Sequence, residues 1–322
     1  MWYYIARRIL YAIPILLGVN ILTFVLFFVV NTPDEIASIH LGSKHVTKQQ
    51  IADWKQAHGY ALPLFYNAEK SSITQTIFWQ KSIKLFLFDF GVADNGRDIS
   101  QAITERYAPS LAIAIPALVF GLLINIIVAM GMAFFRGTYL DAWGVVLCVI
   151  LMSISMLFYI VGGQFLVARI LKWVPVSGYA DGMIGIKFII LPVMVSVIGG
   201  IGSGARWYRS FFLEEINKDY VRTARAKGLS EASILFKHVL RNALIPILTG
   251  VVVLLPLLFM GSLLTESFFA IPGLGSYTID AIRSQDFAIV RAMVFLGSIL
   301  YILGLLLTDI TYIMADPRIE LN

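Results

Sequence analysis

Histidines and cysteines are the side chains best suited to metal or nucleophilic chemistry, and this chain has few of them. Its four histidines are His40, His45, His58 and His238. None belongs to a His-Glu-x-x-His pattern, which would place two zinc ligands and a base on one helical face. His40 and His45 have no cysteine nearby, so solvated side chains are favoured over a metal site. Cys148 is the single cysteine, which excludes an internal disulfide.

Two nucleotide-binding patterns can be tested directly. The Gly-x-x-x-x-Gly-Lys-Ser/Thr loop that cradles the phosphates of ATP occurs nowhere in the chain. The run Gly200-Ile-Gly-Ser-Gly-Ala205 fits the dinucleotide pattern, and Asp219 follows 19 residues after Gly200. That pattern needs a preceding strand in a βαβ unit, whereas these glycines end an apolar stretch. We therefore interpret Gly200 and Gly204 as small residues that let two helices approach closely.

The elements around these residues are apolar. Hydrophobic residues make up 58% of the 322 residues, charged residues 14%, and the mean hydropathy is +0.80. In soluble domains roughly 45–50% of the residues are hydrophobic and roughly 25% are charged. A bilayer is crossed by about 17–25 apolar residues. Stretches of this kind without Asp, Glu, Lys or Arg predict an all-α integral membrane protein with six transmembrane helices: Ile9–Val30, Ala108–Phe135, Ala142–Ala168, Phe188–Ala205, Asn242–Thr265 and Ala292–Thr308.

Lysine and arginine in the short loops predict the orientation. The N-terminus, 136–141, 206–241 and the C-terminus hold twelve basic residues, and the opposite loops 169–187 and 266–291 hold five. We therefore expect both termini in the cytoplasm and the loop 31–107 outside. The first span, with 22 residues, exceeds the roughly 7–15 of a signal-peptide core, so we expect an uncleaved helix. This gives three parts: a helix 1–30, an external cap 31–107, and a transmembrane domain 108–318.

The external loop carries signs of structure. Thr47 and Gln50 form a capping-box pattern, and a helical pattern follows until Gly59. The aromatic-rich segment 73–88 could lie in the membrane interface. A small folded cap and a docking surface for an external partner both fit this loop.

Polar residues in the spans are few. Asn20, Asn125 and Gln164 are neutral, and each either hydrogen-bonds between helices or lines a polar path. Glu266 and Asp309 lie at span ends. Ion-coupled transporters usually bury ionisable groups near the middle of the membrane, so this scarcity counts against that mechanism.

The longest polar, basic stretch of the second half, residues 219–246, predicts two short helices. Glu214 with Lys218, and Asp219 with Arg222, have helical pair spacing, so a helix should continue beyond the fourth span. Gly228 should end it, and Ser230 should cap the next helix. The small residues around this turn suit close approach of another protein, while its basic residues also suit anionic lipid headgroups.

Here the sequence resembles a known family. The segment Tyr220-Val-Arg-Thr-Ala-Arg-Ala-Lys-Gly228, followed by Arg241-Asn-Ala-Leu-Ile-Pro246, is similar to the cytoplasmic "EAA" loop of ABC-importer permeases. The resemblance is to the peptide/nickel subfamily, and within it to the first (B-type) permease subunit of dipeptide and oligopeptide importers. Further similar segments are spread along the chain: 7–18, 88–91, 261–266, 271–275 and 316–318.

The resemblance implies a type I importer permease in a bacterial inner membrane, with no catalytic residue, metal or cofactor of its own. Its partners would be a second permease subunit, two ATPase subunits that bind ATP, an external peptide-binding protein, the peptide and membrane lipid, with no nucleic acid. The coupling loop 206–242 would contact an ATPase through Tyr220, Arg222, Thr223, Ala224, Arg225, Ala226, Gly228 and Ser230. Residues of structural or pore-lining interest are Asn125, Gln164, Glu266, Pro272 and Gly273.

The chain also departs from the family pattern. Arg222 and Thr223 stand where the loop motif usually has Glu and Ala, and Val29-Val-Asn-Thr-Pro-Asp34 replaces the usual Ala-Pro-Gly-Asp-Pro. A secondary ion-coupled transporter is the alternative class. Within ABC importers, nickel and modified or antimicrobial peptides remain alternative substrates.

Overall fold

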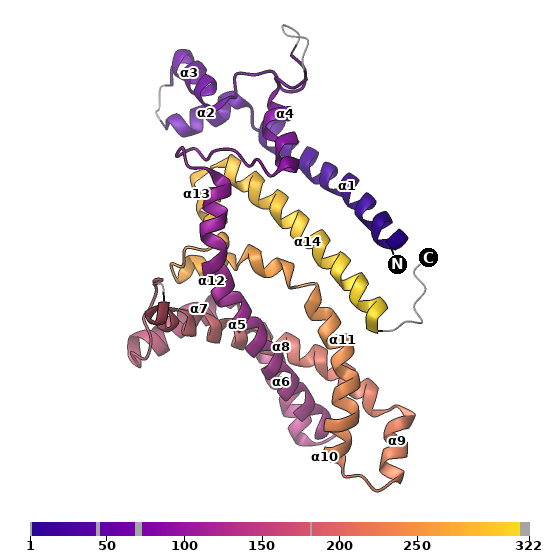
Figure 1. Ribbon diagram of the computed structural model, residues 1–322. Helices are drawn as coiled ribbons and strands as arrows, with labels where there is room; N and C mark the ends of the chain where they lie inside the picture. The colour runs from indigo at the N-terminus through magenta and orange to yellow at the C-terminus, as the bar shows by residue number, and fades with distance from the viewer. Residues whose placement is uncertain (1, 43–45, 68–72, 181, 316–322) are drawn as a thin grey trace. The chain divides into compact units, whose positions relative to one another are not determined.

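The computed structural model describes residues 2–42, 46–67, 73–180 and 182–315 (Figure 1). These residues are helical apart from turns and one isolated antiparallel bridge between Val92 and Asp98. They form two compact units. The first contains Met1–Glu105 and Thr278–Ile302, and the second contains Arg106–Tyr277 and Leu303–Asn322. The all-α prediction is therefore confirmed.

Five helical stretches are long and apolar enough to cross a membrane: Arg7–Val30, Ile99–Phe134, Gly182–Ile216, Glu231–Val252 and Phe287–Thr311. A sixth span exists if a bent pair of helices is counted as one. The pair is Tyr139–Ser153 with Met156–Ile170, and its two parts meet at 87°. The expected single third helix is thus broken. Ser155 adopts an extended conformation and accepts a hydrogen bond from the Phe158 N–H at 3.4 Å, so it starts a new helix.

The fifth predicted span, Asn242–Thr265, is wrong as a continuous helix. Helix α11 (Leu240–Val252) ends in a turn, and a 3₁₀ helix follows over Pro256–Met260. Proline has no N–H to continue the ladder, and Gly261 takes a φ of +67° that reverses the chain. A short helix, α12 (Leu263–Phe268), then begins at a Ser262 cap.

The first unit contains α1 (Trp2–Phe24), its π-helical continuation Val25–Val30, α2 (Pro33–Leu41), α3 (Lys48–His58), α4 (Ile77–Lys81) and the 3₁₀ helix Ile83–Leu87. The capping box at Thr47 and the left-handed Gly59 cap of α3 are confirmed. The core contains Phe24, Phe28, Ile36, Tyr60 and Ile77. Ile77 is fully buried there, so the aromatic-rich segment 73–88 turns part of its apolar surface inward.

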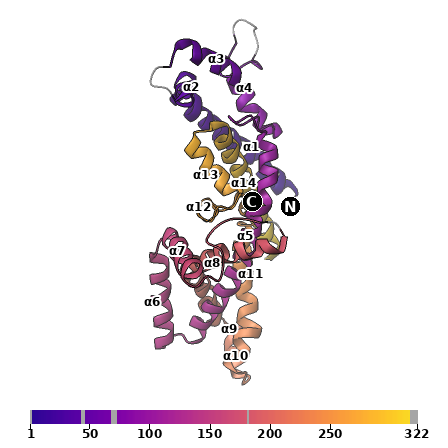
Figure 2. The same ribbon diagram turned by 90° about the vertical axis from the view of Figure 1, so that its left-hand side faces the viewer.

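The second unit contains most of α5 (Ile99–Phe134), then α6 (Tyr139–Ser153), α7 (Met156–Gly163) with a π-helical end Gln164–Ile170, the 3₁₀ helix Gly182–Gly185, α8 (Ile186–Ile216), α9 (Asp219–Ala226) and α10 (Glu231–Ile234). From α10 a π-helical stretch, Leu235–Val239, leads into α11. Besides α5, two helices have residues in both units, α13 (Leu274–Ser284) and α14 (Phe287–Ala315). Figure 2 shows α9 and α10 together at one end of this unit.

Glycines let α8 pack closely on its neighbours. A Cβ added to Gly202 would lie 2.5 Å from the Cys148 carbonyl oxygen of α6, and one added to Gly204 would lie 2.6 Å from the Asn125 amide of α5. Gly200 has open space around it. The predicted helix packing is therefore confirmed for Gly204, while Gly202 rather than Gly200 is its second contact. These glycines lie within one long helix and follow no strand, so they form no dinucleotide site.

Candidate functional site

The first candidate site is the turn between α9 and α10, which the sequence singled out. Helix α8 ends at Ile216, and α9 begins at Asp219 after a break. The helix thus continues beyond the predicted end of the fourth span at Ala205, as expected, but its continuation into residues 219–226 is wrong. Asn217 explains the break: its Nδ2 donates to the Leu213 carbonyl at 2.9 Å, and its Oδ1 accepts from Arg136 at 3.1 Å. Its side chain thus caps the end of α8 and ties it to the end of α5.

Gly228 ends the α9 region with a Schellman motif. Its φ is +76°, and its N–H donates to the Arg225 carbonyl at 2.9 Å. The N–H of Leu229 donates to the Ala224 carbonyl at 3.3 Å. Two carbonyls at the helix end are thereby satisfied. Ser230 then accepts from the Ser233 N–H at 3.3 Å, so both predicted caps are confirmed.

An ion pair closes this turn. Arg225 Nε and Nη2 donate to the two carboxylate oxygens of Glu231 at 2.6 and 3.0 Å. This hydrogen bonding raises the pKa of Arg225 further above its ordinary value. Among the described residues Arg222 pairs with Asp219 alone, at 3.3 Å, and both side chains are largely exposed. Arg225 is therefore held by its own chain, whereas Arg222 lies open to a partner or to lipid.

The inner face of α9 is apolar. Val221 and Ala224 are buried, in a cluster that includes Phe212 near the end of α8 and Ala243 and Ile247 of α11. Ala224 thus makes its close contact inside the molecule, where the resemblance had implied contact with an ATPase. The outer surface, hereafter the turn surface, is exposed and consists of Arg222, Thr223, Arg225, Ala226, Lys227, Gly228, Leu229 and Ser230.

Tyr220 supports the base of α9. Its hydroxyl donates to Glu215 Oε2 at 2.7 Å. Burial, and then this hydrogen bond to Glu215, raise the pKa of Tyr220 to about 12. The phenol therefore stays protonated at neutral pH and remains a hydrogen-bond donor between α8 and α9.

The second candidate site is a cavity of about 370 Å³ in the second unit. Apolar side chains of α5, α7 and the 3₁₀ segment after α11 form most of its wall, and its polar residues are Ser110, Ser196, Ser262, Thr265 and Glu266. Glu266 is 1% exposed. Its Oε1 accepts from the Ser262 N–H at 3.1 Å, and its Oε2 accepts from the Ser276 N–H at 3.0 Å.

Comparison with known proteins identifies the class of this membrane protein. Residues 125–321 match the family described as binding-protein-dependent transport system inner membrane component. The chain belongs to this family. It is 32% identical to a putative peptide transport system permease protein of Brucella abortus and 32% identical to a glutathione transport system permease protein of Salmonella paratyphi A, each over 98% of both chains. It is 29% identical to an oligopeptide transport system permease protein of Bacillus subtilis, over 98% of this chain and 99% of that one.

Three predicted pore residues of this permease lie together. Glu266 fits against Gly261, Gly273 and Gly275, because a Cβ on any of these would collide with its carboxylate. Pro272 precedes Gly273 in this turn and is exposed. Ser110 of α5 joins the same group by accepting from the Leu274 N–H at 2.8 Å. The Glu266 carboxylate is therefore buried, and its hydrogen bonds hold together the segments that form this wall of the cavity.

The other two predicted residues lie elsewhere. Gln164 Nε2 donates to the carbonyls of Val176 at 3.2 Å and Phe268 at 3.0 Å, which links two loops to the bent third span. Asn125 is 8% exposed and faces Gly204. Neither residue lines the cavity beside Glu266. For Gln164 the contacts are those of a structural residue between segments.

One pair in the permease has no signal in the sequence. Asp141 at the start of α6 accepts two hydrogen bonds from Arg209 of α8, at 2.9 and 2.7 Å. Asp141 also accepts from the Gly137 N–H at 3.3 Å. The two side chains are 68 positions apart in the sequence, so no local pattern joins them. The pair fixes α6 to α8.

Proposed function

We propose that this permease is a pore-forming subunit of an ATP-driven importer that moves di- or oligopeptides across the bacterial inner membrane. The main structural support for this proposal is the way the α9–α10 turn is built. Its inner face is packed into the ends of the long helices α8 and α11, and its outer face is polar and exposed. The peptide substrate is supported by the relatives over nearly the full length, whose names include peptide, oligopeptide and glutathione transport.

The turn surface is suited to transmit a movement. Val221 and Ala224 anchor α9 to the helix ends, the Schellman motif fixes the turn, and Arg225 with Glu231 closes it. A partner that pushes on the turn surface therefore moves α8 and α11 with it. We infer that two ATPase subunits supply this push by binding the turn surface more tightly in one nucleotide state than in the other, as coupling requires.

The proposal includes an arrangement in the membrane. Both termini and the turn surface face the cytoplasm, the cap 31–107 faces outside, and residues 108–318 carry the pore. Five basic residues lie between 218 and 237, which agrees with the charge rule: Lys218, Arg222, Arg225, Lys227 and Lys237. A second permease subunit completes the pore, and an external binding protein delivers the peptide.

The cavity beside Glu266 is the candidate for part of the transport path. It is mainly apolar with a few hydroxyl groups, which suits a passage for peptides of varied side chains better than a tight specific site. Among the described residues no group of three or more His, Cys, Asp and Glu could hold a metal ion.

The test is reconstitution. The chain would be co-expressed with its candidate partner permease, ATPases and binding protein, and purified into liposomes. We expect dipeptide uptake that requires ATP and continues when a protonophore collapses the proton gradient. The purified chain by itself should hydrolyse no ATP. Uptake that follows an ion gradient without ATP would show a secondary transporter instead.

A further inference from the structure

The first unit contains a second cavity, separate from the cavity beside Glu266 that we assign to the transport path. Its volume is about 510 Å³, within the range of roughly 300–1,000 Å³ that small-molecule sites have. It lies between the end of α3, α4, the segment 89–96 and the start of α14. Its charged lining residues are Lys81, Lys84, Asp89, Asp94 and Arg291, with His58 and Tyr60 beside them.

Two cations at this cavity form no ion pair within the described part of the chain, although the carboxylates of Asp94 and Asp286 lie near enough to act on both. Arg291 is 4% exposed; its Nη1 donates to the Lys81 carbonyl at 2.8 Å and its Nε donates to the Phe287 carbonyl at 3.2 Å. The Lys81 ammonium lies 5.2 Å from the centre of the Tyr60 ring. Among the described residues neither cation has a carboxylate at ion-pairing distance, whereas Lys84 pairs with Asp89 at 3.6 Å.

This arrangement is unfavourable while the cavity holds only water. Burial, and then the neighbouring Arg291, lower the pKa of Lys81. Asp94 and Asp286 act in the opposite direction, but neither forms an ion pair with Lys81 among the described residues, so this desolvation cost is offset only in part. An anion bound beside Lys81 would offset it further. The cavity therefore favours a ligand that brings a negative charge to Lys81 and Arg291.

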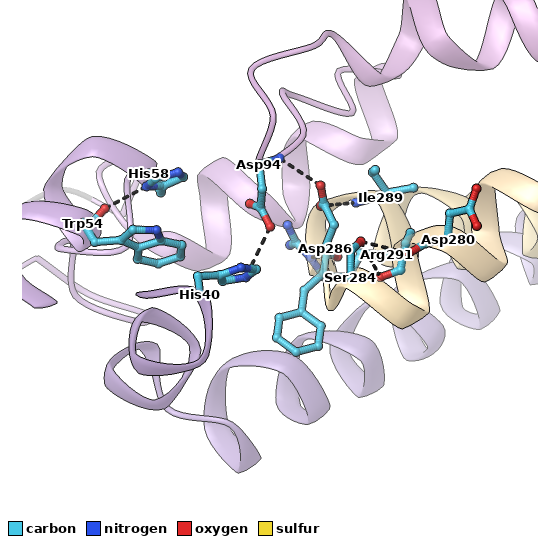
Figure 3. A network of polar contacts seen from close by, with 11 residues as sticks. His40, Trp54, His58, Asp94, Asp280, Ser284, Asp286, Ile289 and Arg291 are labelled. Atoms are coloured by element: carbon cyan, nitrogen blue, oxygen red, sulfur yellow. Dashed lines mark hydrogen bonds and ion pairs between the residues drawn. The ribbon is translucent and has the colours of Figure 1, made fainter. Parts of the chain in front are cut away.

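The same cavity also presents a carboxylate. Figure 3 shows how Asp94 is held: its N–H donates to Asp286 Oδ2 at 2.8 Å, and its Oδ2 lies 3.2 Å from His40 Nε2. Asp286 is itself fixed as the cap of α14 by the Ile289 N–H at 3.2 Å. Burial, and then the Asp286 carboxylate, raise the pKa of Asp94. A ligand with a positive group would offset this second cost.

We propose that this cavity binds a short zwitterionic peptide, with its terminal carboxylate on Lys81 and Arg291 and its terminal ammonium facing Asp94. The cavity volume of about 510 Å³ lies in the range that accommodates small ligands, so the cavity suits a short peptide such as a di- or tripeptide. The inference rests on the proposed peptide transport and adds a second peptide site, in the cap that we place outside the membrane. An acidic side chain of a docked binding protein is the competing occupant, but it would bring no positive group to Asp94.

The test measures binding of labelled dialanine to the full-length chain in nanodiscs, without binding protein or ATPases. Lys81→Gln should weaken binding roughly tenfold or more, as expected for loss of a charged hydrogen bond. Lys81→Arg should retain most of it. The matched control is Lys84→Gln, which removes a cation of the same cavity that already has Asp89 as partner, and it should change affinity little. Dialanine amide, which lacks the carboxylate and so loses the charge contacts with both Lys81 and Arg291, should bind to the wild type at least as weakly as dialanine binds to Lys81→Gln.

Several outcomes would overturn the proposal. Equal affinity for dialanine and its amide would contradict the proposed contact between the peptide carboxylate and Lys81. Unchanged affinity of Lys81→Gln for dialanine would contradict it as well. If the chain binds no dialanine while Lys81→Gln weakens capture of the binding protein, the occupant is a partner's acidic side chain. ATP-dependent uptake by the reconstituted complex is measured in parallel. Uptake without a Lys81 effect on binding refutes only the cap site, whereas absence of any peptide uptake refutes the proposed function.

Discussion

Arg225 and Glu231 form a two-pronged ion pair across Gly228, with nitrogen–oxygen distances of 2.6 and 3.0 Å. Each residue belongs to a different helix of the turn, so the pair fixes the angle between α9 and α10 in addition to the backbone hydrogen bonds. Because the guanidinium of Arg225 is already bound to Glu231, it is less available to a partner protein than the guanidinium of Arg222, whose pair with Asp219 is largely exposed. Position within the turn, rather than charge alone, therefore separates the two arginines.

Breaking this pair should harm coupling more than stability. Both side chains are substantially exposed, and exposed pairs contribute about 0–1 kcal/mol, so Glu231→Gln should shift the thermal unfolding midpoint little. The turn would lose its fixed angle, so peptide uptake per ATP hydrolysed should fall. The control is Glu214→Gln, which removes the exposed pair with Lys218 outside the turn.

A charge exchange sharpens this prediction. The double variant Arg225→Glu with Glu231→Arg restores an ion pair with reversed polarity. If the pair acts by fixing the turn, the exchange should recover part of the uptake lost in each single variant. Equal loss in the single and double variants would show instead that an ATPase contacts Arg225 directly.

Gly228 offers a test of backbone geometry. Its φ of +76° costs other residues about 1–2 kcal/mol, and no other atom lies within 4 Å of an added Cβ. Gly228→Val should therefore disturb the turn through strain alone, whereas Gly228→Asn, which tolerates this conformation, should be milder. Uptake and ATPase stimulation in the assembled complex are the measurements.

Gly137 is the matched control for Gly228. It has a φ of +77° and equally open space, but it lies in the turn between α5 and α6. Gly137→Val should lower stability by a similar amount and leave the ratio of uptake to ATP hydrolysis unchanged. Normal uptake, ATPase activity and assembly in Gly228→Val would contradict a coupling role for Gly228.

Local signals in the sequence were sufficient for the caps and insufficient for the contacts between elements. Thr47, Gly59, Gly228 and Ser230 were predicted correctly, because a cap depends on residues within one helical turn. The broken third span was missed because Ile154 and Ser155 interrupt the helix without interrupting the apolar composition.

The same limit applied to the candidate sites. Glu266 was selected as a polar residue at a span end, but its fit against three glycines depends on how two segments fold back on each other. Ala224 has the composition of a contact residue, and only the packing shows that its contact is internal. The pair of Asp141 and Arg209 and the cavity at Lys81 both join segments that are far apart in the sequence.

Tyr220 gives a prediction for pH dependence. Its pKa of about 12 lies above the ordinary value of 10.0, so the folded state favours the neutral phenol. The resulting stabilisation is fully present below pH 10 and is lost as the pH rises from 10 through about 12. Burial also raises the pKa of Tyr60, so ultraviolet titration of the chain in detergent should show late-titrating tyrosines, and the amplitude of this late phase should fall in Tyr220→Phe. An unchanged titration curve would contradict the contact with Glu215.

Glu266→Gln tests whether the carboxylate organises the cavity wall. Glutamine has the same shape but replaces one accepting oxygen with an NH₂ group, which would face the N–H of Ser262 or Ser276. An unsatisfied buried donor costs about 1–3 kcal/mol, so the variant should unfold at a lower temperature. The turn containing Gly273 should loosen, and uptake should fall even in the fraction that assembles.

Ser196→Ala is the control for this variant. Ser196 lines the same cavity, but its hydroxyl donates to the Pro192 carbonyl within its own helix at 2.8 Å. That carbonyl belongs to the helix ladder, so the loss of the hydroxyl should cost little stability and little uptake. If Glu266→Gln and Ser196→Ala behave alike, the carboxylate does not organise the wall. If only Glu266→Gln lowers both the unfolding temperature and the uptake of the assembled complex, it does, because the two variants differ in the backbone donors that the side chain satisfies.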